Sequence, residues 1–115
     1  MKGLTMVEKF IERPAPESVR LIDFDQAKVV PGIVPETFIL VVSGEKPWEN
    51  MTVRLVPLVY IRQPEYWGIE VTGSLTGIGL PATARYTESL PLDGIKGTRG
   101  IEVIGAFKRE TIALP

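Results

Sequence analysis

Met51 to Gly79, which reads MTVRLVPLVYIRQPEYWGIEVTGSLTGIG, is the most informative stretch of the chain. It holds a long apolar run, a turn rich in proline and aromatic residues, and a second run in which apolar and polar residues alternate. Such alternation is typical of a strand with one buried face, so the second run predicts a strand over Tyr66 to Thr76. The residues expected on its inward face are Trp67, Ile69, Val71 and Leu75.

The first run, Met51 to Arg62, predicts a strand that is apolar on both faces and has Pro57 in its middle. Proline cannot donate a ladder hydrogen bond, so Pro57 indicates an edge strand or a bulge. A bulge would turn all the apolar residues inward, whereas a regular strand would show a second apolar face. That face would need cover from the segment Gly3–Glu12 or from another chain. Thr37–Ser43 is apolar on both faces without a proline, which favours the second interpretation.

The rest of the chain predicts more strands, separated by turn signals at intervals near ten residues. The fold class that we predict is therefore all-β, as a single antiparallel β-sandwich of about six or seven strands, with a β-barrel as the alternative. The further strands are expected at Ser18–Phe24, Thr37–Ser43, Ala82–Leu90, Ile101–Phe107 and Thr111–Leu114, with a turn or short edge piece in Lys28–Val34.

The first residues differ from this pattern, because apolar side chains recur there at helical spacing, at Leu4, Val7, Phe10 and Ile11. A helix of that length is stable only when it is docked, so an extended arm is an equal alternative. We therefore predict an N-terminal arm or short docked helix over residues 1–17, and one all-β domain over residues 18–115.

Composition narrows the classes of function. The 13 Lys and Arg and 14 Asp and Glu residues are evenly spread, so we expect neither nucleic acid nor a membrane as the partner. The absence of cysteine, of a signal-peptide core and of a membrane-spanning run predicts a cytoplasmic protein. The absence of histidine removes the commonest general base and metal ligand. We therefore predict no metal, no cofactor and no catalytic residues.

Four aromatic residues are the predicted interaction residues, namely Trp48, Tyr60, Tyr66 and Trp67. Aromatic side chains on sandwich loops can grip a protein partner or stack on a sugar ring. Core filling is the better interpretation for Tyr60 and Trp67, because both lie within predicted strands and Trp67 belongs to the inward series of its strand. Trp48 lies in a polar loop and is either an exposed contact or a lid over the end of the core.

Two weaker candidates complete the set. The glycine-rich stretch Asp93–Gly100 could bind an anion through Lys96, Gly97 and Arg99, although an ordinary hairpin loop is the favoured interpretation. Glu65 and Glu70 are the one candidate acid–base pair, and solvated surface charge is the stronger interpretation for both.

The function that we expect is a self-associating or protein-interacting β-domain without catalytic activity. A domain that binds a small ligand or a carbohydrate, through Trp48 and Tyr66, is the alternative. An enzyme that runs on carboxylates is the least favoured of the three.

Overall fold

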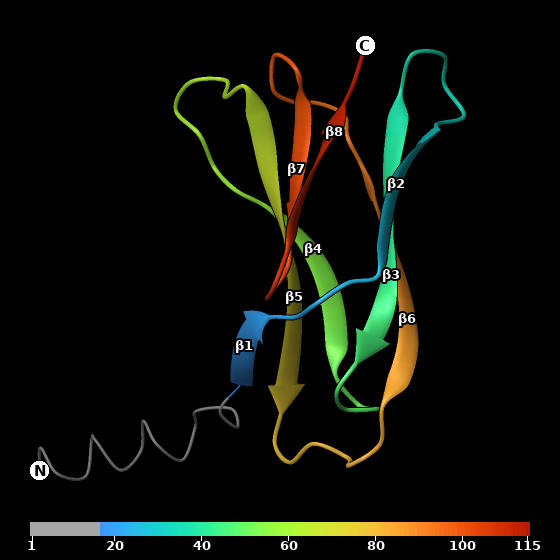
Figure 1. Cartoon of the computed structure of the whole chain (residues 1–115), viewed down its shortest axis with the longest axis vertical. Helices are drawn as coiled ribbons and strands as arrows, with labels where there is room; N and C mark the ends of the chain where they lie inside the picture. Colours follow the sequence, from blue (N-terminus) through green and yellow to red (C-terminus); the bar gives the residue numbers. More distant parts are fainter. Residues whose placement is uncertain (1–16) are drawn as a thin grey trace, which may run out of the picture.

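The computed structural model describes residues 17–115 and shows two packed β-sheets without a closed barrel (Figure 1). The predicted all-β sandwich is confirmed, and the barrel alternative is not. The five-stranded sheet, sheet A, holds β1 (Glu17–Leu21), β4 (Thr52–Pro57), β5 (Tyr66–Thr76), β7 (Gly100–Ile104) and β8 (Arg109–Ala113). The three-stranded sheet, sheet B, holds β2 (Gln26–Pro31), β3 (Phe38–Lys46) and β6 (Ala84–Pro91).

The N-terminal arm or helix predicted over residues 1–17 lies outside the described residues, apart from Glu17, where β1 begins. Within residues 17–115 there is no helix long and apolar enough to cross a membrane.

Strand β5 organises sheet A and has the bounds that its alternation predicts. β4 pairs along one side of it, while the other side is shared by β7 over Tyr66–Glu70 and β1 over Thr72–Thr76. The β5–β7 pair is parallel, whereas the other pairs of both sheets are antiparallel. The purely antiparallel prediction missed this pair because the chain crosses to β6 in sheet B before it returns to sheet A.

The two sheets meet along both long sides of the sandwich. β4 lies against β6 on one side, and β2 lies against β8 on the other. β3 is the central strand of sheet B, and β2 and β6 are its edges. The short edge piece expected in Lys28–Val34 is thus an edge strand that begins earlier, at Gln26.

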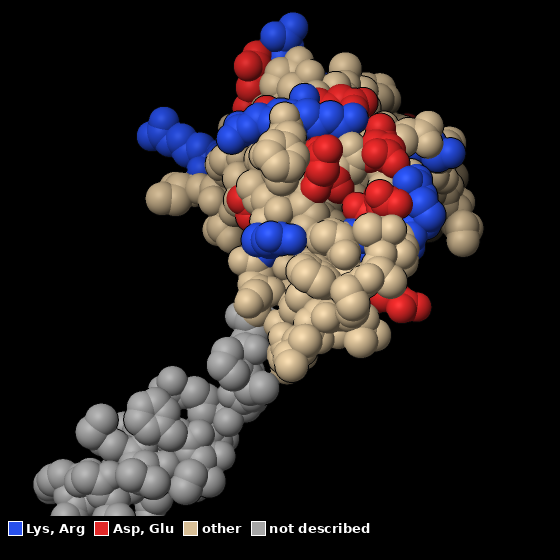
Figure 2. Space-filling view, turned by 60° about the horizontal axis from the view of Figure 1, so that its bottom comes forward, with Lys and Arg blue, Asp and Glu red and all other residues tan. Residues whose placement is uncertain are grey.

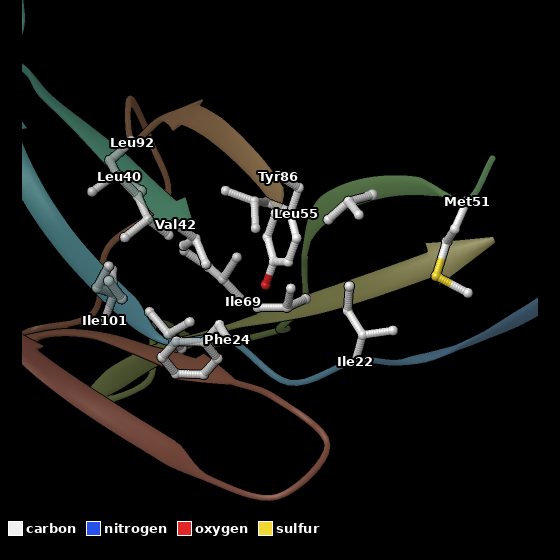
Figure 3. Packing of buried hydrophobic residues seen from close by; sticks show 14 of the residues in the cluster. Ile22, Phe24, Leu40, Val42, Met51, Leu55, Ile69, Tyr86, Leu92 and Ile101 are labelled. Atoms are coloured by element: carbon white, nitrogen blue, oxygen red, sulfur yellow. The ribbon is translucent and has the colours of Figure 1, made fainter. Parts of the chain in front are cut away.

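The core lies between the sheets and is built from the inward positions of their central strands (Figure 3). Ile69 and Val71 of β5 are fully buried, as the alternation predicts, and Trp67 of the same series is half-buried. On β3, Leu40 and Val42 point inward, whereas Ile39 and Val41 on the outer face stay half-buried. The side chains with the largest fully buried volume are Phe24, Leu40, Ile69, Ile101, Val42, Val71 and Val103.

The strand predicted over Met51–Arg62 is wrong in its second half. β4 ends at Pro57, and its register with β5 runs without a slip, so the bulge is absent. The second apolar face is absent as well, because Val56 is the one apolar residue among the three outward positions of β4. Leu58 N donates to Gly68 O (2.9 Å), so Leu58 and Gly68 form a hydrogen-bonded pair. Because such pairs alternate along an antiparallel ladder, the main chain of Pro57, one residue earlier, points away from β5. Proline therefore costs no ladder bond at this edge position, which was one of the two predictions for it.

Candidate functional site

The outer edge of β1 presents main-chain groups that no strand of the described chain pairs with. Within residues 17–115, β1 pairs with β5 alone. Ile22 N donates to Val71 O (3.0 Å), so these two residues form a hydrogen-bonded pair, and every second residue of β1 back from Ile22 bonds to β5 in the same way. The main chain of Ser18 and Arg20 therefore bonds to β5, while the N–H and C=O groups of Val19 and Leu21 point away from it. In the other half of the sheet, β8 occupies the corresponding position beside β7 (Figure 1).

The turn between β7 and β8 closes one end of this unfilled strand position. Ala106 N donates to Ile22 O (3.1 Å), and Gly105 N donates to Lys108 O (2.9 Å). The Lys108 ammonium donates to Asp25 O (3.2 Å) and lies 4.6 Å from the centroid of the Phe24 ring, in cation–π geometry. These contacts hold the turn in place from both sides.

Phe107 lies at the tip of this anchored turn, and 88% of its surface is exposed. The sequence pattern predicted it at the end of the strand Ile101–Phe107, facing inward, and this is wrong. β7 ends at Ile104, because the chain turns there to form the hairpin with β8. Val19 on β1 is also exposed, at 60%. Two apolar side chains thus stand in water next to unpaired main-chain groups.

Three neighbouring clefts are lined by residues of β1, and together they are called the groove below. The largest, of about 410 Å³, lies between Arg20–Asp23, the end of β3 at Glu45–Pro47, and the β7–β8 turn. A second, of about 360 Å³, shares Leu21 and Phe107 with it. A third, of about 240 Å³, lies beyond Arg20. Within residues 17–115, sheet A therefore ends at β1 on this side, and the clefts lie along that strand.

The charges along this groove are mixed. Arg20 and Lys46 line the largest cleft together with Asp23 and Glu45. The Lys46 ammonium also donates to Met51 O (2.9 Å). Figure 2 shows both signs intermixed over the upper part of the face in view, while the surface nearest the start of the described chain is mostly uncharged. Such a surface does not select a strongly charged ligand.

Tyr86 supports the groove from inside the sandwich. Its hydroxyl donates to Asp23 O (2.8 Å) and so ties β6 to the segment that follows β1. Burial, followed by the negative charges of Asp25 and Asp23, raises the pKa of Tyr86 to about 12. The phenol therefore stays neutral and keeps donating this bond well above its ordinary titration range.

Tyr60 and Trp67, two of the predicted interaction residues, pack on each other. Their rings meet edge to face, with centroids 5.2 Å apart and planes at 75°. The Tyr60 hydroxyl accepts a bond from Gly68 N (3.1 Å), and Trp67 Nε1 donates to Leu58 O (2.9 Å). These contacts pin the loop after β4 onto β5, and both rings are half-buried, with Trp67 packed against the core.

The same loop exposes two aliphatic side chains that the sequence placed in a strand. Val59 is 95% exposed and Ile61 is fully exposed. They lie on either side of the anchored Tyr60, so the loop that holds them is well fixed.

Trp48 and Tyr66 lie at opposite ends of β5. Trp48 is half-buried against the core, and its indole lies so close to Gly79 that a Cβ there would have no room. It also lines the third cleft beside Leu75, near the end of β5, whereas Tyr66 begins that strand. This geometry favours the lid interpretation of Trp48, and the two rings do not form a shared platform for a sugar.

In the predicted anion-binding loop, three main-chain N–H groups already donate hydrogen bonds to carbonyl oxygens of the chain. Thr98 N and Arg99 N donate to the carbonyls of Pro64 and Glu65 (both 2.9 Å), and Gly97 N donates to Gly100 O (2.8 Å). Lys96 Nζ lies 3.4 Å from Pro115 O. An anion would have to displace these bonds, so the site stays a prediction that the geometry does not favour.

The two members of the candidate acid–base pair, Glu65 and Glu70, have different surroundings. Arg99 Nη1 donates to the exposed carboxylate of Glu65 (2.9 Å), and this bond raises the pKa of the guanidinium. Glu70 is half-buried on β5 and has Val56 and Ile104 as its ladder partners. Residues 17–115 contain no group of three or more acidic side chains that could hold a metal ion.

Sequence reasoning missed Val19, Leu21 and Phe107. Phe107 between Ala106 and Lys108 in a short connection was a usable signal, because a turn seldom buries a large ring. Val19 and Leu21 gave no local signal, since their exposure depends on which strands lie beside β1. Comparison of the chain with protein-family models, with curated proteins and with solved structures finds no match.

Proposed function

We propose that this chain is a protein-interaction module that binds an extended segment of a partner as an added strand beside β1. The observation that carries the proposal is the unfilled strand position, with the outward main-chain groups of Val19 and Leu21 along it. An exposed strand edge is a template for another strand, whose main chain supplies affinity and whose alternate side chains supply specificity.

The other four edge strands support this choice, because three of them carry a proline that β1 lacks and β8, which has none, lies against β2. β2, β4 and β6 end in prolines, namely Pro31, Pro57 and Pro91. β8 lies against β2, and β4 lies against β6. Within the described chain, β1 has neither a proline nor a facing strand from sheet B among its main contacts.

A small ligand in the largest cleft is the second candidate. Its volume of about 410 Å³ falls within the usual range for ligand sites, and charged and apolar groups converge there. For either function we propose the cytoplasm as the place of action, on the absence of cysteine.

The test is a selection of peptides from a random library on the full chain, followed by binding measurements on variants. Val19→Pro removes an outward N–H without breaking a bond between β1 and β5. We expect the selected peptides to bind Val19→Pro and Val19→Lys at least about tenfold more weakly. The matched control, Val59→Lys, places the same charge at an exposed valine outside the groove and is expected to bind normally.

Peptides that bind Val19→Pro as tightly as the wild type would contradict the proposal, and so would a selection that yields no binder. Binding of small metabolites in the groove without any peptide binder would favour the second candidate.

A further inference from the structure

We infer that the strand that fills the position beside β1 is β1 of a second copy of this chain, which runs antiparallel across a twofold axis. This inference rests on the proposed function and names its partner. Each β1 has one open edge within the described chain, so a single pairing satisfies both copies. The result is a closed dimer, in which sheet A of one copy continues into sheet A of the other.

The charge of Arg20 separates the two antiparallel registers in which Val19 lies opposite Val19 or opposite Leu21. The outward main-chain groups belong to Val19 and Leu21, so an antiparallel ladder must place outward residues opposite one another. With Val19 opposite Val19 of the second copy, Ser18 lies opposite Arg20 of that copy. With Val19 opposite Leu21, Arg20 lies opposite Arg20, and like charges directly opposite are destabilising. The first register is therefore the favoured one.

The same register brings together apolar side chains that are exposed in the single chain. Val19 packs against Val19 on the outer face of the joined sheet, where both are exposed in the single chain. The β7–β8 turn, with the exposed Phe107, lies at the end of the added strand in each copy. The pairing nevertheless involves edges of five residues, which bury less than a standard interface. The dimer is therefore weak and depends on concentration.

A cross-linking experiment tests directly whether Val19 lies opposite Val19 of the second copy. The chain has no cysteine, so Val19→Cys introduces a single thiol. Opposite residues in a hydrogen-bonded antiparallel pair have Cα atoms about 5.5 Å apart, a distance that a disulfide spans. Under a mild oxidant we expect Val19→Cys to form a covalent dimer at least about tenfold faster than Val59→Cys, although position 59 is the more exposed of the two, at 95% against 60%.

Sedimentation of the full chain measures the same contact without chemistry. Val19→Pro is expected to raise the dimer dissociation constant at least about tenfold, and Val59→Lys to leave it unchanged. Ser18→Glu places a carboxylate opposite Arg20 twice per dimer and is expected to tighten it severalfold, whereas Ser18→Lys weakens it. Equal dimerisation of the wild type and Val19→Pro would place the contact elsewhere and overturn the inference.

The remaining outcomes separate the inference from the proposed function. A wild type that stays monomeric at about 1 mM, while library peptides bind at β1, would overturn the self-pairing and leave the module standing. A monomer that binds no peptide either would overturn both. Val19 and Leu21 amides that are protected from hydrogen exchange at every concentration would mean that residues 1–16 of the same chain fill the position, and this too would overturn the self-pairing.

Discussion

The two halves of β5 have different neighbours. Beside Tyr66–Glu70, sheet A continues through β7 to β8, whereas beside Thr72–Thr76 it stops at β1. Both halves belong to one strand and pair with β4 on the other side. The difference therefore comes from strands far away in the sequence, and it leaves one half of the sheet complete and the other with an open edge.

Burial follows the same division. Ile101 of β7 faces the core and is completely buried, whereas Arg20, which faces the same way on β1, is exposed. On the outer face of β1, Val19 is 60% exposed. The half of the sheet beside β7 therefore contributes more to the core than the half beside β1.

The largest effect is expected from alanine substitution on the two strands that share this side of β5. Ile101→Ala should lower the free energy of unfolding by about 3–4 kcal/mol, because it opens a cavity in the core. Val19→Ala should change it by less than about 0.5 kcal/mol. Urea unfolding of dilute protein, followed by tryptophan fluorescence, checks both values. A cost at Val19 that matches the cost at Ile101 would show that β1 is buried in the folded chain.

The next effect concerns pH and the bond from Tyr86 to Asp23, which supports the open half. The folded chain keeps the Tyr86 proton up to a pKa of about 12, whereas the unfolded chain releases it near 10. The contribution of the neutral phenol to the free energy of unfolding is thus complete below pH 10. It falls by about 2 kcal/mol as the pH rises toward 12. Unfolding of the wild type and Tyr86→Phe across this range should show the decline in the wild type alone. Parallel declines would mean that other tyrosines or lysines cause the loss.

The smallest effect is expected in the complete half, at the loop that Tyr60 pins. Tyr60→Phe removes the acceptor of the Gly68 N–H and should cost about 1 kcal/mol. Tyr66→Phe is the matched control, because no hydrogen bond of its hydroxyl occurs within the described residues, and it should cost less than about 0.5 kcal/mol. Thermal unfolding of both variants provides the measurement. Equal losses would mean that the loop is held by the ring contact with Trp67 rather than by the hydroxyl.

Local pattern predicted much of the fold. The alternation over Tyr66–Thr76 gave the bounds of β5, and Pro57 correctly indicated an edge strand, because proline cannot donate within a ladder. Pattern failed where the direction of the chain changes. Val59–Ile61 continued an apolar run yet left the ladder, and Phe107 continued an alternating series yet lay on a turn.

The candidate site was less predictable than the fold. The aromatic residues that stood out in the sequence, Tyr60 and Trp67, serve to hold a loop on β5. The residues at the open edge, Val19 and Leu21, form part of an ordinary-looking strand. An unfilled strand position is a property of the whole sheet, so no single segment carries a signal for it.

Periodicity and proline were enough to locate most of the strands and the buried face of β5, but three of the predicted strands ran past the points where β1, β4 and β7 end. The sequence by itself also removed histidine and cysteine chemistry. The tertiary structure alone decided that β5 pairs with β7 in parallel and that β7 and β1 share one side of β5. It also decided that no described strand lies beside β1. The physical reason is that ladder hydrogen bonds join segments that are distant in the chain, and their partners are fixed only when the two sheets pack.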